Sequence, residues 1–165
     1  TVSNSTLDNA TIDNMTINNN SVVQNQTLQN DNLSGFTSST SPTVTSFFLK
    51  KSGSWVSGDG SINVDVDTNI YIYFSETMDN SSITVNTSDT SCSGTFQLSL
   101  DSFSSCVPIS SYTSWNNLKY FYFDPTSNLT SGITYHVRVT TGAKDGSDNS
   151  MSSNYTTSSG FTVTK

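Results

Sequence analysis

The sequence has few of the residues on which most catalytic and nucleic-acid-binding sites depend. Its 165 residues include one histidine and two cysteines, and six lysines and arginines against thirteen acidic residues give a net charge of −7. A Ser–His–Asp or Cys–His site would have to use His136, the single histidine. Binding DNA or RNA through the phosphates needs a basic surface. We therefore expect a protein that is not an enzyme and has no nucleic-acid partner.

Long apolar runs and the usual metal-binding patterns are also missing. No run approaches the roughly 20 apolar residues that span a bilayer, so we expect no membrane insertion by this segment. The acidic stretches at residues 59–67 and 145–149 lack the fixed oxygen spacing of known calcium loops. We expect neither a bound metal nor a cofactor.

The residues that are abundant favour β-structure. Serine, threonine and asparagine make up nearly half of the chain, aromatic residues 11% and charged residues 12%. Helix formers are scarce, whereas β-branched and aromatic residues suit pleated, half-buried strands. The length fits one β-sandwich and an additional segment. The predicted fold class is all-β.

The additional segment is residues 1–36, in which apolar residues recur every five positions. The series is Leu7, Ile12, Ile17 and Val22, and after a slip of one residue it resumes as Val23, Leu28 and Leu33. A period of five matches neither a helix nor a strand, so it requires a backbone that bends regularly. A β-solenoid or a winding fibre shaft has such a backbone.

Three interpretations of this segment remain open: a disordered linker, a β-helix resembling the pentapeptide-repeat family, and part of an intertwined homotrimeric shaft. We favour the trimer, because one apolar residue per repeat is too little to bury in a single chain. Leu7, Ile12, Ile17, Val22, Leu28 and Leu33 would then form the trimer contact. Residues 37–42 read as a linker before a domain at residues 43–165.

Two motifs carry the most information about that domain. Residues 68–79 read TNIYIYFSETMD, and residues 132–145 read GITYHVRVTTGAKD. Together they resemble the bacterial Ig-like module of surface-layer proteins and surface lipoproteins, over about residues 42–163. The resemblance implies an Ig-like antiparallel β-sandwich and an extracellular, cell-surface location. One departure is Asp148, which stands where the family pattern has glycine.

Alternating hydrophobicity predicts the strands of this sandwich and their inward faces. Residues that should point into the core include Ile70, Ile72 and Phe74, and likewise Phe121, Phe123, Leu129, Tyr135, Val137 and Val139. The expected strands are residues 43–49, 62–66, 69–75, 82–86, 95–100, 118–124, 133–140 and 160–164.

The cysteines Cys92 and Cys106 lie within the Ig-like stretch. They are either two reduced thiols or a disulfide, and we favour the disulfide. Closing a loop of about fifteen residues would contribute on the order of 3 kcal/mol. Some members of the resembled family carry a similar pair, and a persistent disulfide indicates an oxidising compartment.

Two groups of aromatic residues are candidates for ligand binding. Tyr71 and Tyr73 on one strand, and Tyr120 and Tyr122 on another, should face outward from neighbouring strands. Ordinary cross-strand pairing explains such a patch without any partner, but tyrosine also suits a subunit contact or a sugar-binding platform. The second group lies in predicted loops and comprises Trp55, Tyr112, Trp115 and Asn116. These residues either cap the core or recognise a glycan or protein.

The function predicted from the sequence is an extracellular fibre tip or adhesin. A homotrimer formed through residues 1–36 would present the Ig-like domain to a cell-surface glycan or protein. The alternatives are a passive spacer module of a surface protein array and a fibre subunit that assembles by strand exchange.

Overall fold

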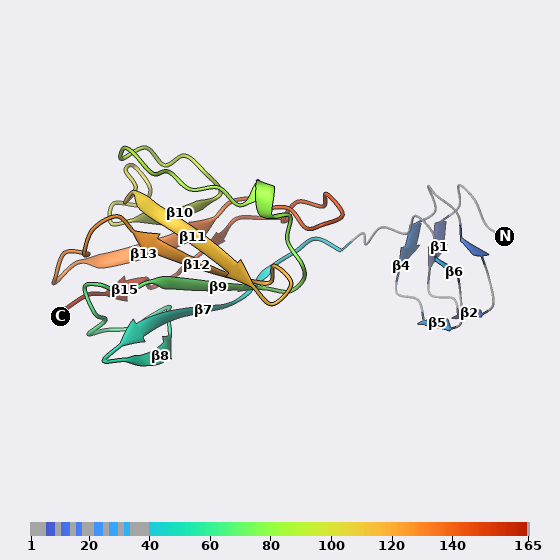
Figure 1. Ribbon diagram of the computed structural model, residues 1–165, viewed down its shortest axis with the longest axis horizontal. Coiled ribbons are helices and arrows are strands. Elements are labelled where there is room, and N and C mark those ends of the chain that lie inside the picture. Colours follow the sequence, from blue (N-terminus) through green and yellow to red (C-terminus); the bar gives the residue numbers. More distant parts are fainter. Residues whose placement is uncertain are drawn as a thin grey trace. The chain divides into compact units, whose positions relative to one another are not determined.

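The computed structural model describes residues 40–164 and six short strands in the first thirty-three residues (Figure 1). The chain divides into two compact units, Thr1–Thr40 and Ser41–Lys165. The strands of the first unit are β1 (Thr6–Asp8), β2 (Thr11–Asp13), β3 (Thr16–Ile17), β4 (Val22–Gln24), β5 (Thr27–Gln29) and β6 (Asn32–Leu33).

These six strands form three parallel pairs with one constant offset. β1 pairs with β4, β2 with β5 and β3 with β6, and each partner lies sixteen residues further along the chain. The register places Leu7 opposite Val23, and Ile12 opposite Leu28. The first strands of the three pairs are β1, β2 and β3, and their partners are β4, β5 and β6. The one-residue slip in the repeat of five thus lies at the passage from the first three strands to the second three. Trimerisation through this segment stays a prediction, and residues 37–39 of the predicted linker lie outside the described residues.

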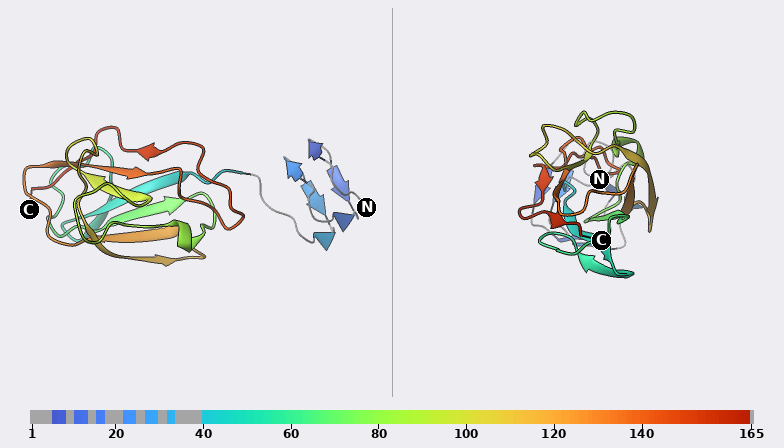
Figure 2. Two further views of the ribbon diagram at one scale, coloured as in Figure 1. Left: turned by 90° about the horizontal axis from the view of Figure 1, so that it is seen from above. Right: turned by 90° about the vertical axis from the view of Figure 1, so that its left-hand side faces the viewer.

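The second unit is a sandwich of two mainly antiparallel sheets, which Figure 2 shows from above and from one end. One sheet has five strands in the order β11-β12-β9-β7-β8. In the other, β13 pairs with β10, β14 and β15. The bounds are β7 (Val44–Lys51), β8 (Ser54–Ser57), β9 (Ile70–Phe74), β10 (Phe96–Ser99), β11 (Ile109–Trp115), β12 (Tyr120–Pro125), β13 (Thr134–Val139), β14 (Tyr155–Thr156) and β15 (Phe161–Thr162), with a short 3₁₀ helix η1 (Asn80–Ser82).

The core lies between the two sheets and confirms the predicted inward faces. Every residue that the alternation assigned to the interior is buried, and so is Leu129, which was expected to fill a turn: Ile70, Ile72, Phe74, Phe121, Phe123, Leu129, Tyr135, Val137 and Val139. The sheets meet through aromatic rings, because Phe96 of β10 stacks on Phe123 of β12 with ring centroids 3.7 Å apart. The chain therefore has the all-β, Ig-like sandwich that its sequence predicts.

Two predicted strands are absent from the sandwich. In residues 62–66, Val64 makes a single bridge to Val163, and Asn63 takes a left-handed φ of 59° that interrupts an extended run. In residues 82–86, Ser82 ends η1 and the Thr84 N–H donates to the side-chain oxygen of Thr95 rather than to a backbone carbonyl. Both predictions are wrong, because each stretch makes only isolated backbone hydrogen bonds to a neighbour and no continuous ladder.

Two predicted loops are strands instead. Trp55 lies in β8, which forms a hairpin with β7, and Tyr112 and Trp115 lie in β11, which forms a hairpin with β12. Their serine- and threonine-rich sequences hid them, because an edge strand with one solvated face carries little apolar signal. Asn116 does lie in a turn, where its φ is 52°.

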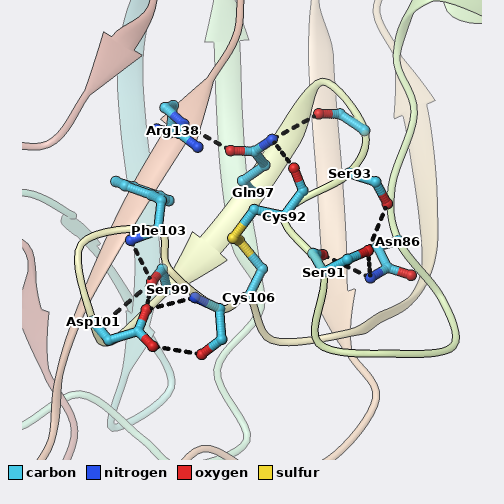
Figure 3. The surroundings of a disulfide bond; sticks show 12 residues. Asn86, Ser91, Cys92, Ser93, Gln97, Ser99, Asp101, Phe103, Cys106 and Arg138 are labelled. Atoms are coloured by element: carbon cyan, nitrogen blue, oxygen red, sulfur yellow. Dashed lines mark hydrogen bonds between the residues drawn. A yellow bond between two sulfur atoms is a disulfide. The ribbon is translucent and has the colours of Figure 1, made fainter.

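The disulfide between Cys92 and Cys106 is formed, with a Cα–Cα distance of 4.9 Å (Figure 3). The loop that it closes is held by further hydrogen bonds. The side-chain amide N–H of Gln97 donates to the Cys92 carbonyl oxygen. The guanidinium of Arg138 donates to the side-chain oxygen of Gln97 at 2.7 Å. Asp101 accepts hydrogen bonds from the hydroxyls of Ser99 and Ser105.

Asp148, where the family pattern has glycine, takes a backbone conformation that glycine also favours. Its φ is 69°, in the left-handed region that glycine favours and that aspartate tolerates better than most residues. Its carboxylate also forms an ion pair with Lys144 at 2.7 Å.

Candidate functional site

The outer face of the five-stranded sheet carries rows of tyrosine. β9 and β12 are antiparallel neighbours whose register sets Tyr73 opposite Tyr120 and Tyr71 opposite Tyr122. Successive side chains of a strand point to opposite faces, so these four point away from the core when Ile72 and Phe121 point into it. The rings of Tyr73 and Tyr120 stack with centroids 4.2 Å apart.

Both tryptophans reach this tyrosine row from the two edges of the sheet. Trp55 comes from β8 at one edge, and its ring centroid lies 4.0 Å from that of Tyr71 at an interplanar angle of 70°. Trp115 comes from the end of β11 at the other edge, 5.9 Å from Tyr71 at 74°. It also stacks on Tyr120 at 5.5 Å. Tyr71 on the central strand is therefore the ring on which the two indoles converge.

The rings surround a depression of about 320 Å³ that we call the aromatic hollow, lined by Phe48, Trp55, Tyr71, Trp115 and Tyr120. Trp55 is 50% exposed and Trp115 is 43% exposed, so each indole presents much of its surface to solvent. No charged side chain lines the hollow. The surface suits a ligand with an apolar face of its own.

Lys50 and the tyrosine hydroxyls supply the polar groups nearest to the hollow. The ammonium of Lys50 lies 5.7 Å from the Trp55 ring centroid, within the range of a cation–π contact. Burial, followed by the proximity of Tyr122, raises the pKa of Tyr71 to about 12. Tyr71 is therefore a neutral phenol at physiological pH, able to donate and accept a hydrogen bond.

A second depression, which we call the polar hollow, adjoins the same face. It measures about 330 Å³, and its lining includes Asp67, Asn69, Tyr122, Asp124 and Asn128. The amide of Asn69 donates to the Tyr122 hydroxyl. Burial, and then the negative charge of Asp124, raise the pKa of Tyr122. The two residues lie two positions apart on β12, so their side chains point to the same face.

Tyrosines link the two hollows directly. The ring of Tyr71, which lines the aromatic hollow, contacts the ring of Tyr122, which lines the polar one, with centroids 4.9 Å apart. The two depressions are thus bordered by neighbouring positions of β9 and β12.

The structure brings together six of the eight predicted ligand-binding residues, namely Trp55, Tyr71, Tyr73, Trp115, Tyr120 and Tyr122. Tyr112 points to the opposite face and packs near Phe123, 5.9 Å between centroids. Asn116 lies in the turn after Trp115 and does not line the aromatic hollow. Sequence reasoning missed Phe48 and Lys50, although the alternation of Phe47 and Phe48 within β7 already required one of them to face outward.

Comparisons with known proteins agree with this architecture. Residues 38–163 match the model of the bacterial Ig-like domain family, so the chain belongs to that family. A search of curated proteins found no match.

Three similar solved structures are all of the S-layer protein SbsC. Its crystal structure is 18% identical with a TM-score of 0.47, over 76% of this chain and 14% of that one. A structure of its domains 1–6 is 18% identical with a TM-score of 0.49, over 77% and 14%. Its N-terminal part is 17% identical with a TM-score of 0.48, over 76% and 24%. This chain therefore spans less than a quarter of each.

Neither a membrane-crossing helix nor a metal-binding cluster is found in the described part of the chain. None of its helices has the length and apolarity that crossing a bilayer takes. Within the same residues, no three histidine, cysteine or acidic side chains gather where they could hold a metal ion.

Proposed function

We propose that the Ig-like domain is a non-catalytic extracellular module that binds a surface glycan through the aromatic hollow. The observation that carries the proposal is the convergence of Trp55 and Trp115, from opposite sheet edges, on Tyr71. Indole and phenol rings offer large, rigid contact surfaces, and the phenols add hydroxyls. A sugar ring has the complementary character, with an apolar face of C–H groups and hydroxyls around its edge.

The extracellular location is supported by the disulfide and by the family. The Cys92–Cys106 bond persists in an oxidising environment, and such bonds are rare in the cytosol. Membership of the bacterial Ig-like family fits a domain of a surface protein. The similar structures named above are of an S-layer protein.

A glycan array probed with the full chain tests the proposal. The matched variants are Trp55→Ala and Trp115→Ala, with Ile62→Ala and Leu100→Ala as controls, because these two exposed hydrophobic residues do not line the hollow. We expect the unmodified chain and both controls to bind the same glycans. Each tryptophan variant should bind at least tenfold more weakly while keeping its melting temperature within a few degrees.

Two results would contradict glycan binding. If the unmodified chain binds no glycan, the passive spacer becomes the better account. If the tryptophan variants bind as well as the controls do, binding takes place elsewhere on the domain.

Trimerisation through residues 1–36 would strengthen a weak single site by raising the effective concentration of the others. Light scattering of the full chain and of a version that begins at Thr37 tests it. A trimer that becomes a monomer on truncation supports the shaft. A monomer in both cases would mean that the parallel pairs within one chain are its final arrangement, and polymers that disappear on truncation would favour strand exchange.

A further inference from the structure

We infer that the glycan bound at this face is a neutral or amino-sugar chain that extends from the aromatic hollow into the polar hollow, and that Asp67 and Asp124 select against acidic sugars. This inference rests on the proposed function and adds a second subsite and a ligand class to it.

Continuity of the two hollows is the first argument. Tyr71 and Tyr122 are directly opposed across β9 and β12, and each lines one of the hollows. A ligand long enough to leave the aromatic hollow over Tyr71 meets Tyr122 next. The two rings are in contact, with centroids 4.9 Å apart, so the two depressions lie on either side of one pair of rings. A single ring fits one hollow, whereas a chain of sugars can occupy both.

The two hollows differ in the chemistry of their linings. The aromatic hollow is lined by five aromatic side chains, whereas the polar hollow is lined mostly by carboxylates, amides and hydroxyls. An oligosaccharide satisfies both, since each unit offers a C–H face for stacking and hydroxyls for hydrogen bonds to carboxylate and amide groups.

Two carboxylates give the polar hollow a negative charge. Asp67 is exposed and Asp124 is half-buried, and both carboxylates line the polar hollow. Asp124 lies two residues after Tyr122 on β12, so both side chains point to the same face and line the same hollow. No lysine or arginine lines this hollow. A uronate or sialate seated there would be repelled, whereas hydroxyls and ammonium groups would find acceptors.

The test is an array of matched pairs, each a neutral glycan with its carboxylated counterpart, probed with the full chain. We expect binding to be confined to neutral and amino-sugar members, and to be at least tenfold weaker for each acidic counterpart of a bound glycan. The ratio of the affinity for a neutral glycan to that for its acidic counterpart should fall towards one in Asp67→Asn, Asp124→Asn and their double variant. Asp148→Asn is the control, because it removes one negative charge away from both hollows and its asparagine tolerates the positive φ.

Chain length supplies an independent readout. Calorimetry with the shortest bound glycan and with successively longer forms should show affinity rising until both hollows are filled and then levelling off. Phe48→Ala changes the aromatic hollow alone, so it should lower the affinity for every glycan. The increase of affinity with chain length should persist in this variant.

Different results overturn different parts of the account. Acidic members that bind as tightly as neutral ones, or a ratio that the aspartate variants leave unchanged, overturn the selection against acidic sugars. Affinity independent of chain length overturns the second subsite. In both cases loss of binding in Trp115→Ala would keep the proposed function, whereas a chain that binds no glycan at all would remove the function and this inference together.

Discussion

Trp55 and Tyr71 contact each other with ring centroids 4.0 Å apart, although β7 separates their strands in the sheet. The contact spans two inter-strand spacings, which the side chains of Trp55 and Tyr71 bridge together. It makes Tyr71 the centre of the aromatic hollow, with Trp115 approaching from the other side.

Substitution of Tyr71 should separate the contribution of its ring from that of its hydroxyl. Tyr71→Ala removes the ring on which both indoles rest, so we expect loss of glycan binding and a change in the near-ultraviolet circular dichroism of the tryptophans. Tyr71→Phe keeps the ring, and its affinity should stay within a few-fold of the unmodified chain. Equal loss in both variants would assign the main role to the hydroxyl instead.

The two faces of the five-stranded sheet should respond very differently to loss of a phenyl ring. Phe123 is 1% exposed and stacks across the sandwich on Phe96, so Phe123→Ala should lower the free energy of unfolding by about 3–5 kcal/mol. Phe48 is 38% exposed on the outer face, and Phe48→Ala should cost much less. Urea denaturation measures both. Similar losses would mean that the outer face is packed in the free protein.

Two glycines with positive φ offer a matched test of backbone crowding. A Cβ at Gly160 would lie 2.4 Å from the carbonyl oxygen of Tyr135, whereas at Gly132 it would meet nothing within 4 Å. Gly132→Ala should cost about 1–2 kcal/mol from the left-handed conformation alone. Gly160→Ala should cost clearly more, because the Tyr135 carbonyl cannot move without disturbing the pairing of β13 with β15. Equal losses on thermal unfolding would contradict this.

Acid should destabilise the domain partly through Asp101. Hydrogen bonds from Ser105, and then from Ser99, hold the pKa of Asp101 at about 2, below its usual 3.8. A carboxyl whose pKa is lower in the folded state stabilises the fold above the unfolded-state value, and that stability is lost as the pH falls from about 3.8 through about 2.

Thermal unfolding between pH 2 and pH 5 measures this effect. Asp101→Asn should show a shallower fall in melting temperature than the unmodified chain. Ser105→Ala, which keeps the carboxylate but removes its first donor, should lie between the two. The fall in melting temperature that remains in Asp101→Asn comes from other carboxyls with a lowered pKa. One of them is Asp89, which accepts hydrogen bonds from Ser91. Identical curves for all three proteins would exclude Asp101 as a contributor.

The sequence predicted the central part of the sandwich well, because buried strands alternate strongly. Ile70, Ile72 and Phe74 could be placed in the core from their spacing alone, and Tyr71 and Tyr73 were then necessarily outside. The edge strands could not be found in this way. β8 and β11 consist largely of serine, threonine and aromatic residues, so their pairing partners, rather than their own pattern, determine that they are strands.

The candidate residues were therefore predicted as two groups, whereas six of the eight lie together on one sheet face. Trp55 and Trp115 were expected in loops at the ends of the sandwich, and only the hairpins β7–β8 and β11–β12 bring them to the tyrosine row. The polar hollow had no sequence signal, because Asp67 and Asp124 lie 57 positions apart and meet only through the register of β9 and β12.

The most direct test of the account follows the two indole N–H signals by NMR as a glycan identified on the array is added to the ¹⁵N-labelled chain. The account predicts that the signals of Trp55 and Trp115 both shift and saturate at the same glycan concentration, together with the backbone amides around Tyr71. Saturable binding that leaves both indole signals unmoved would contradict it.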